Sequence, residues 1–191
     1  METVLGICLG LGLAAACGFR VFVPLFLMSL AAKTGFIELA DNFGWISSWP
    51  AFTAFATATV LETAAYYIPW FDNLLDAVAT PAAVVAGVIA TAASIVDADP
   101  FIQWSAAIIG GAGVAGTVQT SFVATRSAST IITGGLGNFV LATFEWVGAF
   151  FMSIVAVLAP IFAALVALGL TAAALSMLFR RVDRPASGGG T

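Results

Sequence analysis

Long apolar runs separated by short polar segments make up almost the whole chain. A helix needs about 20 apolar residues, each rising about 1.5 Å, to cross the hydrocarbon core of a bilayer. Six runs meet this requirement: Thr3–Ala32, Pro50–Trp70, Leu74–Val96, Phe101–Thr133, Phe139–Val157 and Pro160–Phe179. The pattern therefore predicts an all-α integral membrane protein with about six transmembrane helices.

Turn-forming and interfacial residues mark the borders of these runs. The segments between the first five runs are 33–49, 70–73, 97–100 and 134–138. Lys33–Trp49 combines charges, glycines and tryptophans, which is typical of an interfacial loop or short surface helix. The last 43 residues before the basic tail would form a helix of about 65 Å, twice the hydrocarbon thickness. Pro160 is the predicted break between the last two spans, and one span followed by a re-entrant hairpin is the alternative.

The first and fourth runs are longer than a straight crossing requires. Each is therefore expected to be strongly tilted or broken in the middle. In the first run Gly18, Arg20 and Pro24 lie close together, which favours a break, because proline cannot donate the helical hydrogen bond. In the fourth run the small residues of Gly110–Gly116 precede a polar stretch.

Composition excludes a soluble protein. Hydrophobic residues make up 61% of the 191-residue chain and charged residues 8%, and the mean hydropathy is +1.09. A soluble domain is about 25% charged. We predict one transmembrane domain over residues 1–184, followed by a flexible tail at 185–191. There is no basic patch for nucleic acid.

Catalytic and metal-binding chemistry is not predicted. The chain has no histidine, and its two cysteines, Cys8 and Cys17, lie two helical turns apart, too far for a disulfide. No GxSxG motif or metal-ligand cluster is present, so we predict neither an enzyme nor a cofactor. Four aspartates lie at span ends and are interpreted as caps and solvated turns: Asp72, Asp76, Asp97 and Asp99.

The two halves of the chain show a similar order of unusual residues. Arg20 is followed by Glu62, and Arg126 is followed by Glu145, each order ending on a proline in the next span. Repeats at 1–99 and 100–182 with three spans each would be inverted in the membrane, as in many transporters. Chance similarity in an alanine-rich chain is the alternative interpretation.

Four charges lie inside the predicted spans: Arg20, Glu62, Arg126 and Glu145. An arginine at the centre of a membrane helix costs about 2.5 to 3.5 kcal/mol on insertion scales, and pairing reduces this cost. The simplest hypothesis is two Arg–Glu pairs. Such pairs either lock helix register or mark a substrate site.

A polar face on the fourth run gives the second functional signal. Helical spacing places Gln119, Arg126, Ser129, Thr130 and Thr133 on one side of that span. This face suggests a hydrated groove or pore wall, although Ser and Thr hydroxyls can also bond back to their own helix. The predicted substrate or ion pathway is Arg20, Glu62, Gln119, Arg126, Ser129, Thr130 and Glu145.

The stretches "GLGLAAACGFRVFVPLFLMSLAA" and "TRSASTIITGGLGN" resemble those of a family of small bacterial membrane proteins. That family is catalogued as a domain of unknown function. The resemblance covers nearly the whole chain and implies a multi-pass protein of the inner (cytoplasmic) membrane. It implies no substrate and no functional residue.

Orientation follows from the basic residues. Arg180–Arg184 carries three of the six lysines and arginines, and such clusters stay in the cytoplasm. An even number of spans then predicts that both termini are cytoplasmic.

Two function classes follow from the residues. The first is a small transporter or channel for an anionic solute or a lipid phosphate head group, because two arginines lie in the spans. The second is a non-transporting scaffold or accessory subunit, in which the charges only fix register. The lipid bilayer is the expected partner in both, and a homo-oligomer is compatible with either.

Overall fold

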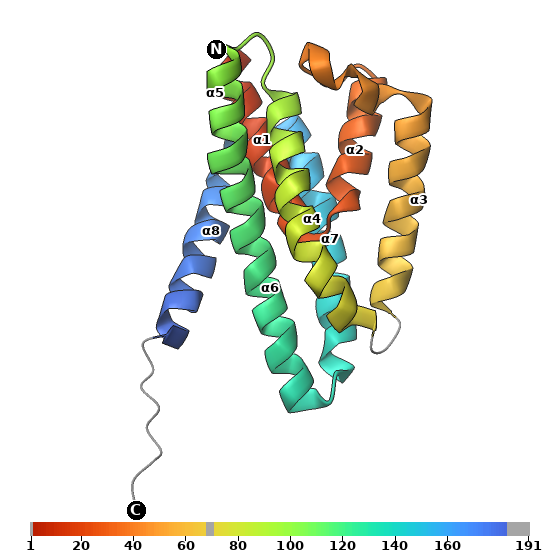
Figure 1. Ribbon diagram of the computed structural model, residues 1–191, viewed down its shortest axis with the longest axis vertical. Coiled ribbons are helices and arrows are strands. Elements are labelled where there is room, and N and C mark those ends of the chain that lie inside the picture. The colour runs from red at the N-terminus through yellow and green to blue at the C-terminus, as the bar shows by residue number, and fades with distance from the viewer. Residues whose placement is uncertain (1, 68–70, 183–191) are drawn as a thin grey trace, which may run out of the picture.

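The computed structural model describes residues 2–67 and 71–182, which are helical and contain no β-strand (Figure 1). Five segments are long and apolar enough to cross a membrane: Glu2–Phe19, Asp76–Ser94, Pro100–Thr133, Leu136–Leu158 and Pro160–Phe179. They correspond to α1, α4, the continuous run of α5 to α6, α7 and α8. The prediction of an all-α, multi-pass membrane protein is confirmed. The predicted tail at 185–191 lies outside the described residues.

The first long run is a hairpin of two helices. Helix α1 (Glu2–Phe19) ends before Arg20, and α2 (Phe22–Lys33) turns back toward the end where α1 began (Figure 1). The contacts agree, because the Ala40 amide donates to the Ala93 carbonyl at 3.0 Å and Gly6 packs on Ser94. The predicted break is therefore present, and Pro24 lies in the first turn of α2, where its missing N–H costs nothing.

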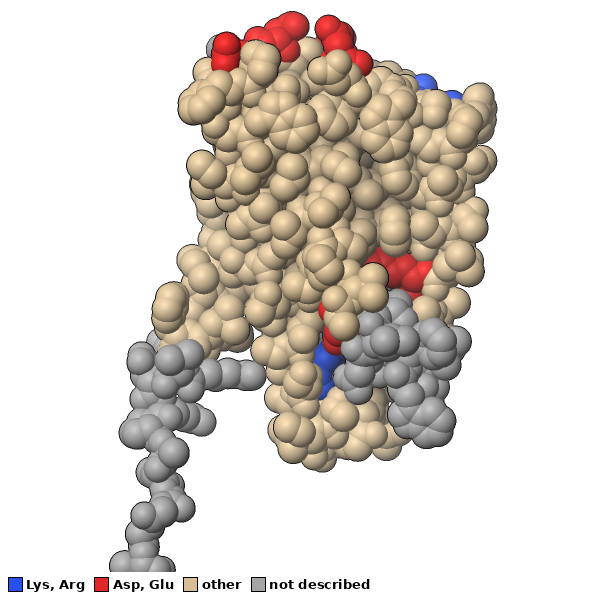
Figure 2. Space-filling model, viewed as in Figure 1, with Lys and Arg blue, Asp and Glu red and all other residues tan. Residues whose placement is uncertain are grey.

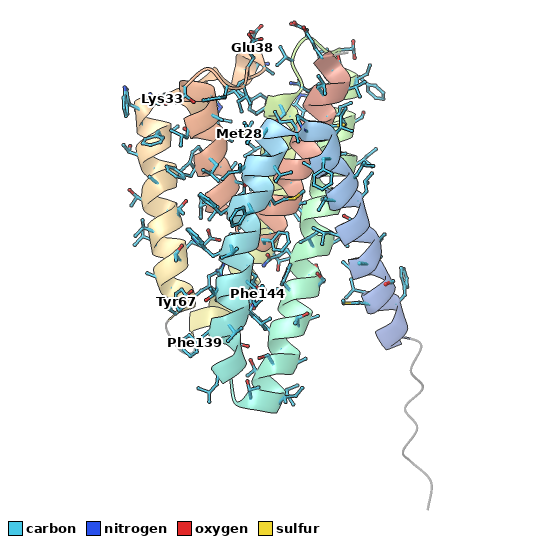
Figure 3. The ribbon with its side chains drawn as sticks, turned by 180° about the vertical axis from the view of Figure 1, so that it is seen from behind. Met28, Lys33, Glu38, Tyr67, Phe139 and Phe144 are labelled. Atoms are coloured by element: carbon cyan, nitrogen blue, oxygen red, sulfur yellow. The ribbon has the colours of Figure 1, made fainter. Side chains whose placement is uncertain are left out.

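The second predicted span is α3 (Trp49–Tyr66), preceded by the short 3₁₀ helix η1 (Asp41–Ser47). Lys33 and Glu38 lie near one end of the bundle, and Tyr67 lies toward the other (Figure 3). Helix α3 therefore runs along most of the length of the bundle. It is not among the segments apolar enough to cross, because four threonines dilute its apolar residues. Each threonine hydroxyl donates to a carbonyl of α3 itself, which satisfies it locally. Residues 68–70, the predicted end of this span, lie outside the described residues.

The fourth run is one unbroken helical segment. Helix α5 (Pro100–Ser105) continues through a π-helical turn, η2 (Ala106–Gly111), into α6 (Ala112–Thr133). The π turn lies where α6 meets α4 (Phe71–Ser94), and the backbones approach closely at Gly87 and Gly111. The fourth run thus contains a local change of helix type and no break.

The last two helices are α7 (Leu136–Leu158) and α8 (Pro160–Val182), which meet at Pro160 as predicted. Helix α1 lies at the centre and packs on α4, α6, α7 and α8. Its core-facing side is built of small residues, including Ala14, Ala15 and Ala16, which are fully buried. Small side chains allow membrane helices to pack closely.

The hairpin changes the predicted topology. Because α1 and α2 enter and leave at the same end, the beginning of α1 and the end of α8 lie at opposite ends of the bundle (Figure 1). The prediction that both termini share one side of the membrane counted the first run as a full crossing. It stays a prediction, which the hairpin does not favour.

Helix directions restrict the predicted repeat. Leu11 packs beside Gly110 and Gly18 beside Val118, so α1 and α6 run parallel, whereas inverted repeats would oppose them. The inverted repeat is therefore not supported over the whole of 1–99. Helices α2, α3 and α4 do run opposite to α6, α7 and α8, respectively (Figure 1).

Candidate functional site

Three of the predicted charges meet inside the bundle. Glu145 of α7 has no exposed surface, and it contacts two arginines whose exposure is 2% each. Its Oε2 lies 3.2 Å from Arg20 Nη2, and its Oε1 lies 3.2 Å from Arg126 Nε. Arg20 lies at the tip of the α1–α2 hairpin, whereas Arg126 belongs to α6. One carboxylate thus joins three separate parts of the fold.

The cluster also contains two residues that sequence analysis missed. Asp76 of α4 forms an ion pair with Arg126, in which Arg126 Nη1 and Asp76 Oδ1 lie 2.6 Å apart. The Asp76 side chain is buried, with 8% of the residue exposed. Its interpretation as a cap or solvated turn is wrong, because α4 begins at Phe71 and places Asp76 in the second turn, against the core. Tyr66 of α3 donates from its hydroxyl to Asp76 Oδ1 at 3.2 Å.

Tyr66 also stacks on the arginines. Its ring centroid lies 3.6 Å from Arg20 Cζ and 4.7 Å from Arg126 Cζ, which is cation–π geometry. A sequence signal for Tyr66 did exist, since it follows Glu62 by four residues and so shares its helix face. A signal for Asp76 existed as well, because it lies inside the predicted span Leu74–Val96, whereas Asp72, Asp97 and Asp99 lie in the connecting segments.

Glu62 does not form the predicted ion pair with an arginine. Its Oε1 accepts the amide of Val21 at 2.9 Å, and its Oε2 accepts the amide of Phe22 at 3.1 Å. These amides open α2, so the carboxylate of Glu62 caps a helix N-terminus from another helix. The hypothesis of two separate Arg–Glu pairs is therefore replaced by a shared Glu145 and a capping Glu62.

The polar face of α6 divides into a buried and a surface part. Gln119 and Arg126 are buried, whereas Ser129 and Thr130 are half-buried and Thr133 is exposed. The hydroxyls of Thr130 and Thr133 donate to carbonyls of α6 itself at 3.0 and 2.8 Å. Thr130 also accepts from Asn138 Nδ2 at 2.9 Å across the α6–α7 turn. These hydroxyls thus have local partners and need no hydrated groove.

Several buried donors of the cluster lack an acceptor. Among the described residues, Nε and Nη1 of Arg20, Nη2 of Arg126 and Nε2 of Gln119 form no hydrogen bond. Unsatisfied buried donors are uncommon in native proteins and call for an explanation, such as a ligand or solvent. Three carboxylates and two guanidiniums give the cluster a formal charge of −1, counting Glu62, Asp76 and Glu145 against Arg20 and Arg126.

The cysteines and the other possible metal ligands form no site in the described part of the chain. Cys8 and Cys17 are free thiols, and no group of His, Cys, Asp and Glu within the described ranges is placed to hold a metal ion.

Comparison with known proteins gives one match. A family model described as a domain of unknown function, DUF4126, matches residues 7–180. No curated protein and no solved structure matches the chain.

Proposed function

The chain belongs to the DUF4126 family, and we propose that this member is a membrane transporter whose site is the cluster of Arg20, Arg126 and Glu145. Its substrate would be an anion, either a small solute or the phosphate head group of a lipid. The observation that carries the proposal is the sharing of one buried carboxylate by two arginines. A transporter is favoured over an open channel because these three side chains are 0–2% exposed.

The charges suggest how an anion could enter. A guanidinium binds phosphate and carboxylate with the same fork geometry, so a substrate anion can replace the carboxylate of Glu145. If Glu145 takes up a proton as it leaves, one positive and one negative charge arrive together. The formal charge of the cluster then stays at −1, which avoids the cost of a new buried charge. We therefore propose proton–anion cotransport.

The helix arrangement supports this proposal. Transporter sites commonly lie where discontinuous helices end inside the bilayer, and Arg20 lies at such an end. We further propose that α2–α4 and α6–α8 are inverted counterparts. Their superposition about an axis in the membrane plane, in an experimental structure, is the expected result. If no such axis relates them, the repeat hypothesis is wrong.

Orientation is proposed from the basic residues. We place the Arg180–Arg184 end in the cytoplasm of a bacterial inner-membrane protein and the start of α1 on the outer side.

A scaffold remains the second candidate function. The observation that favours it is that the cluster already joins the α1–α2 hairpin to α3, α4, α6 and α7 through its own charges. A scaffold would need these contacts for stability only. Double variants that remove one arginine together with its acidic partner would then fold and would show no loss of activity.

Proteoliposomes test the two functions. The purified chain would be reconstituted, and two probes would be followed: radiolabelled inorganic phosphate, and fluorescently labelled phosphatidic acid reported by dithionite reduction. We expect at least one probe to move faster than in protein-free vesicles, and faster still when its source side is acidified. Glu145→Gln should abolish the response to acid, because an amide cannot carry the proton, whereas the exposed Glu38→Gln should retain it. Protein-free rates for both probes with folded wild type would contradict the transport proposal.

A further inference from the structure

A lateral groove leads from the lipid-facing surface to the edge of the cluster. It has a volume of about 350 Å³ and lies between the start of α2, α3 and α4. Its wall is apolar except for Glu62 and Tyr66, and the outer residues Leu61 and Val78 are 64% and 65% exposed. Figure 2 shows acidic atoms on this face between α4 and α3, and a second acidic patch beside basic atoms lower on the same face. The groove thus ends on Glu62 and Tyr66 of α3.

The inner end of the groove has the features of a phosphate site. Glu62 accepts the amides of Val21 and Phe22, which form the N-terminus of a 12-residue helix. Such an N-terminus attracts anions through its free amides and its dipole, and phosphate fits it as well as a carboxylate does. Glu62 therefore occupies the place that an anionic ligand would take.

A second feature independently points to a ligand. Arg20 directly precedes these amides and is 2% exposed. Its Nη2 lies 3.2 Å from Glu145 Oε2 and donates to the Ala142 carbonyl at 3.2 Å, whereas its Nε and Nη1 have no acceptor among the described residues. Tyr66 lines the groove and its ring covers the guanidinium at 3.6 Å. A rotation of Tyr66 would expose Arg20 to the groove. The two amides, once Glu62 has left them, and a guanidinium donor of Arg20 can together bind the oxygens of one phosphate group.

The wall indicates where the phosphate comes from. A free ion would have to cross the lipid-facing apolar wall without its hydration shell, at a high cost. A lipid avoids this cost, because its acyl chains stay in the groove and the surrounding bilayer while only its head group enters. The position of α3 would allow such entry, since it packs mainly on α2 and contacts α7 near its end through Tyr67 and Thr143, 2.8 Å apart.

We propose that this groove binds a phosphate-bearing membrane lipid, with the phosphate on the α2 N-terminus and Arg20 and the chains along α3 and α4. Glu62 takes up a proton and leaves the amides when the phosphate enters, and the Tyr66 ring, which covers Arg20 in this structure, rotates aside so that the phosphate reaches the guanidinium. This inference rests on the proposed transport function for its purpose, because it names the lipid as the transported anion. The binding itself can be tested without transport.

Native mass spectrometry provides the binding test. The full chain would be loaded with phosphatidic acid or with diacylglycerol of the same chains, and retained lipid would be counted. We expect retention of phosphatidic acid over diacylglycerol, and more phosphatidic acid in Glu62→Gln, because the competing carboxylate charge is gone. Equal retention of the two lipids by wild type would overturn the phosphate site.

Two tryptophan variants locate the site. Ala65→Trp fills the groove, whereas Ala64→Trp adds the same side chain to an exposed position of α3 outside it. Ala65→Trp should lose phosphatidic acid binding and Ala64→Trp should keep it. Ala58→Trp, also in the groove, replaces Ala65→Trp if that variant does not fold. Normal retention in a folded groove variant would contradict the inference.

The same variants separate this inference from the proposed function. In proteoliposomes, movement of inorganic phosphate without any movement or binding of phosphatidic acid would overturn the lipid site and leave anion transport standing. Groove-dependent binding of phosphatidic acid, without movement of either probe, would overturn transport and leave the lipid site standing.

Discussion

Removal of the Arg126 guanidinium should destabilise the fold strongly. The ion pairs of Arg126 predict which second substitution will restore the lost stability. Arg126→Ala deletes a 2.6 Å ion pair with Asp76 and a 3.2 Å ion pair with Glu145. Breaking a buried pair costs about 3–5 kcal/mol, because the partner charge stays buried. For a chain of this size, a loss of that magnitude lowers the melting temperature by about 6–20 °C, at about 2–4 °C per kcal/mol.

The two acids should differ in their power to rescue. Glu145 keeps Arg20 as a cationic partner when Arg126 is lost, whereas Asp76 loses its ion pair with Arg126 and keeps the Tyr66 hydroxyl. Asp76→Asn in the Arg126→Ala background should therefore recover a large part of the lost stability. Glu145→Gln in that background should recover little, because it removes the carboxylate partner of Arg20.

The assay is thermal unfolding of the detergent-purified chain, followed by the loss of the monodisperse peak in fluorescence-detected size exclusion. Glu38→Gln is the control, because an exposed surface change stays within about 0.5 kcal/mol. An unchanged melting temperature for Arg126→Ala would show that the cluster is hydrated in the membrane. Better rescue by Glu145→Gln than by Asp76→Asn would refute the pairing described above.

Further predictions concern packing and topology. Gly18→Ala should lower the melting temperature, because its new Cβ would lie 2.6 Å from Val118 Cβ and overpacking costs about 1–3 kcal/mol, whereas Gly113→Ala, with nothing within 4 Å, should not. Cysteine probes placed in 41–48 and beside Glu2 should react with the same impermeant reagent, from the side opposite to a probe in the tail. Equal stability of the two glycine variants, or labelling of 41–48 and the tail from one side, would contradict these predictions. Ser48→Ala should cost about 0.5–2 kcal/mol, because the Ser48 hydroxyl accepts the Ala51 amide and caps α3; an unchanged melting temperature would exclude that role.

Sequence patterns predicted the helical spans well, because a membrane helix must be long, apolar and bounded by turn residues. The break at Pro160, the glycine turn at 134–135 and the interruption near Arg20 all follow from backbone chemistry. The direction taken after the interruption could not be predicted. A hydropathy pattern is the same for a helix that continues across the membrane and for one that turns back, so the α1–α2 hairpin was counted as a full crossing.

The charged site was predicted in part for a similar reason. A lone charge in an apolar run is visible in the sequence, and Arg20, Arg126, Glu62 and Glu145 were found in this way. Their partners depend on which helices meet. Asp76 lies near a helix end in the sequence, yet its side chain is buried because α4 begins five residues earlier. Glu62 accepts hydrogen bonds from backbone amides of α2, and a search for pairs of charged residues cannot find such a partner.

The most direct test of the central claim is the transport rate of the stable double variant, Arg126→Ala with Asp76→Asn. The variant keeps the Arg20–Glu145 pair and the capping Glu62 but lacks one of the two guanidiniums proposed to hold the anion. Reconstituted beside wild type at equal protein content, it should move inorganic phosphate and labelled phosphatidic acid no faster than protein-free vesicles do. Wild-type rates in this folded variant would show that the arginine pair serves only stability and would contradict a transport role for the cluster.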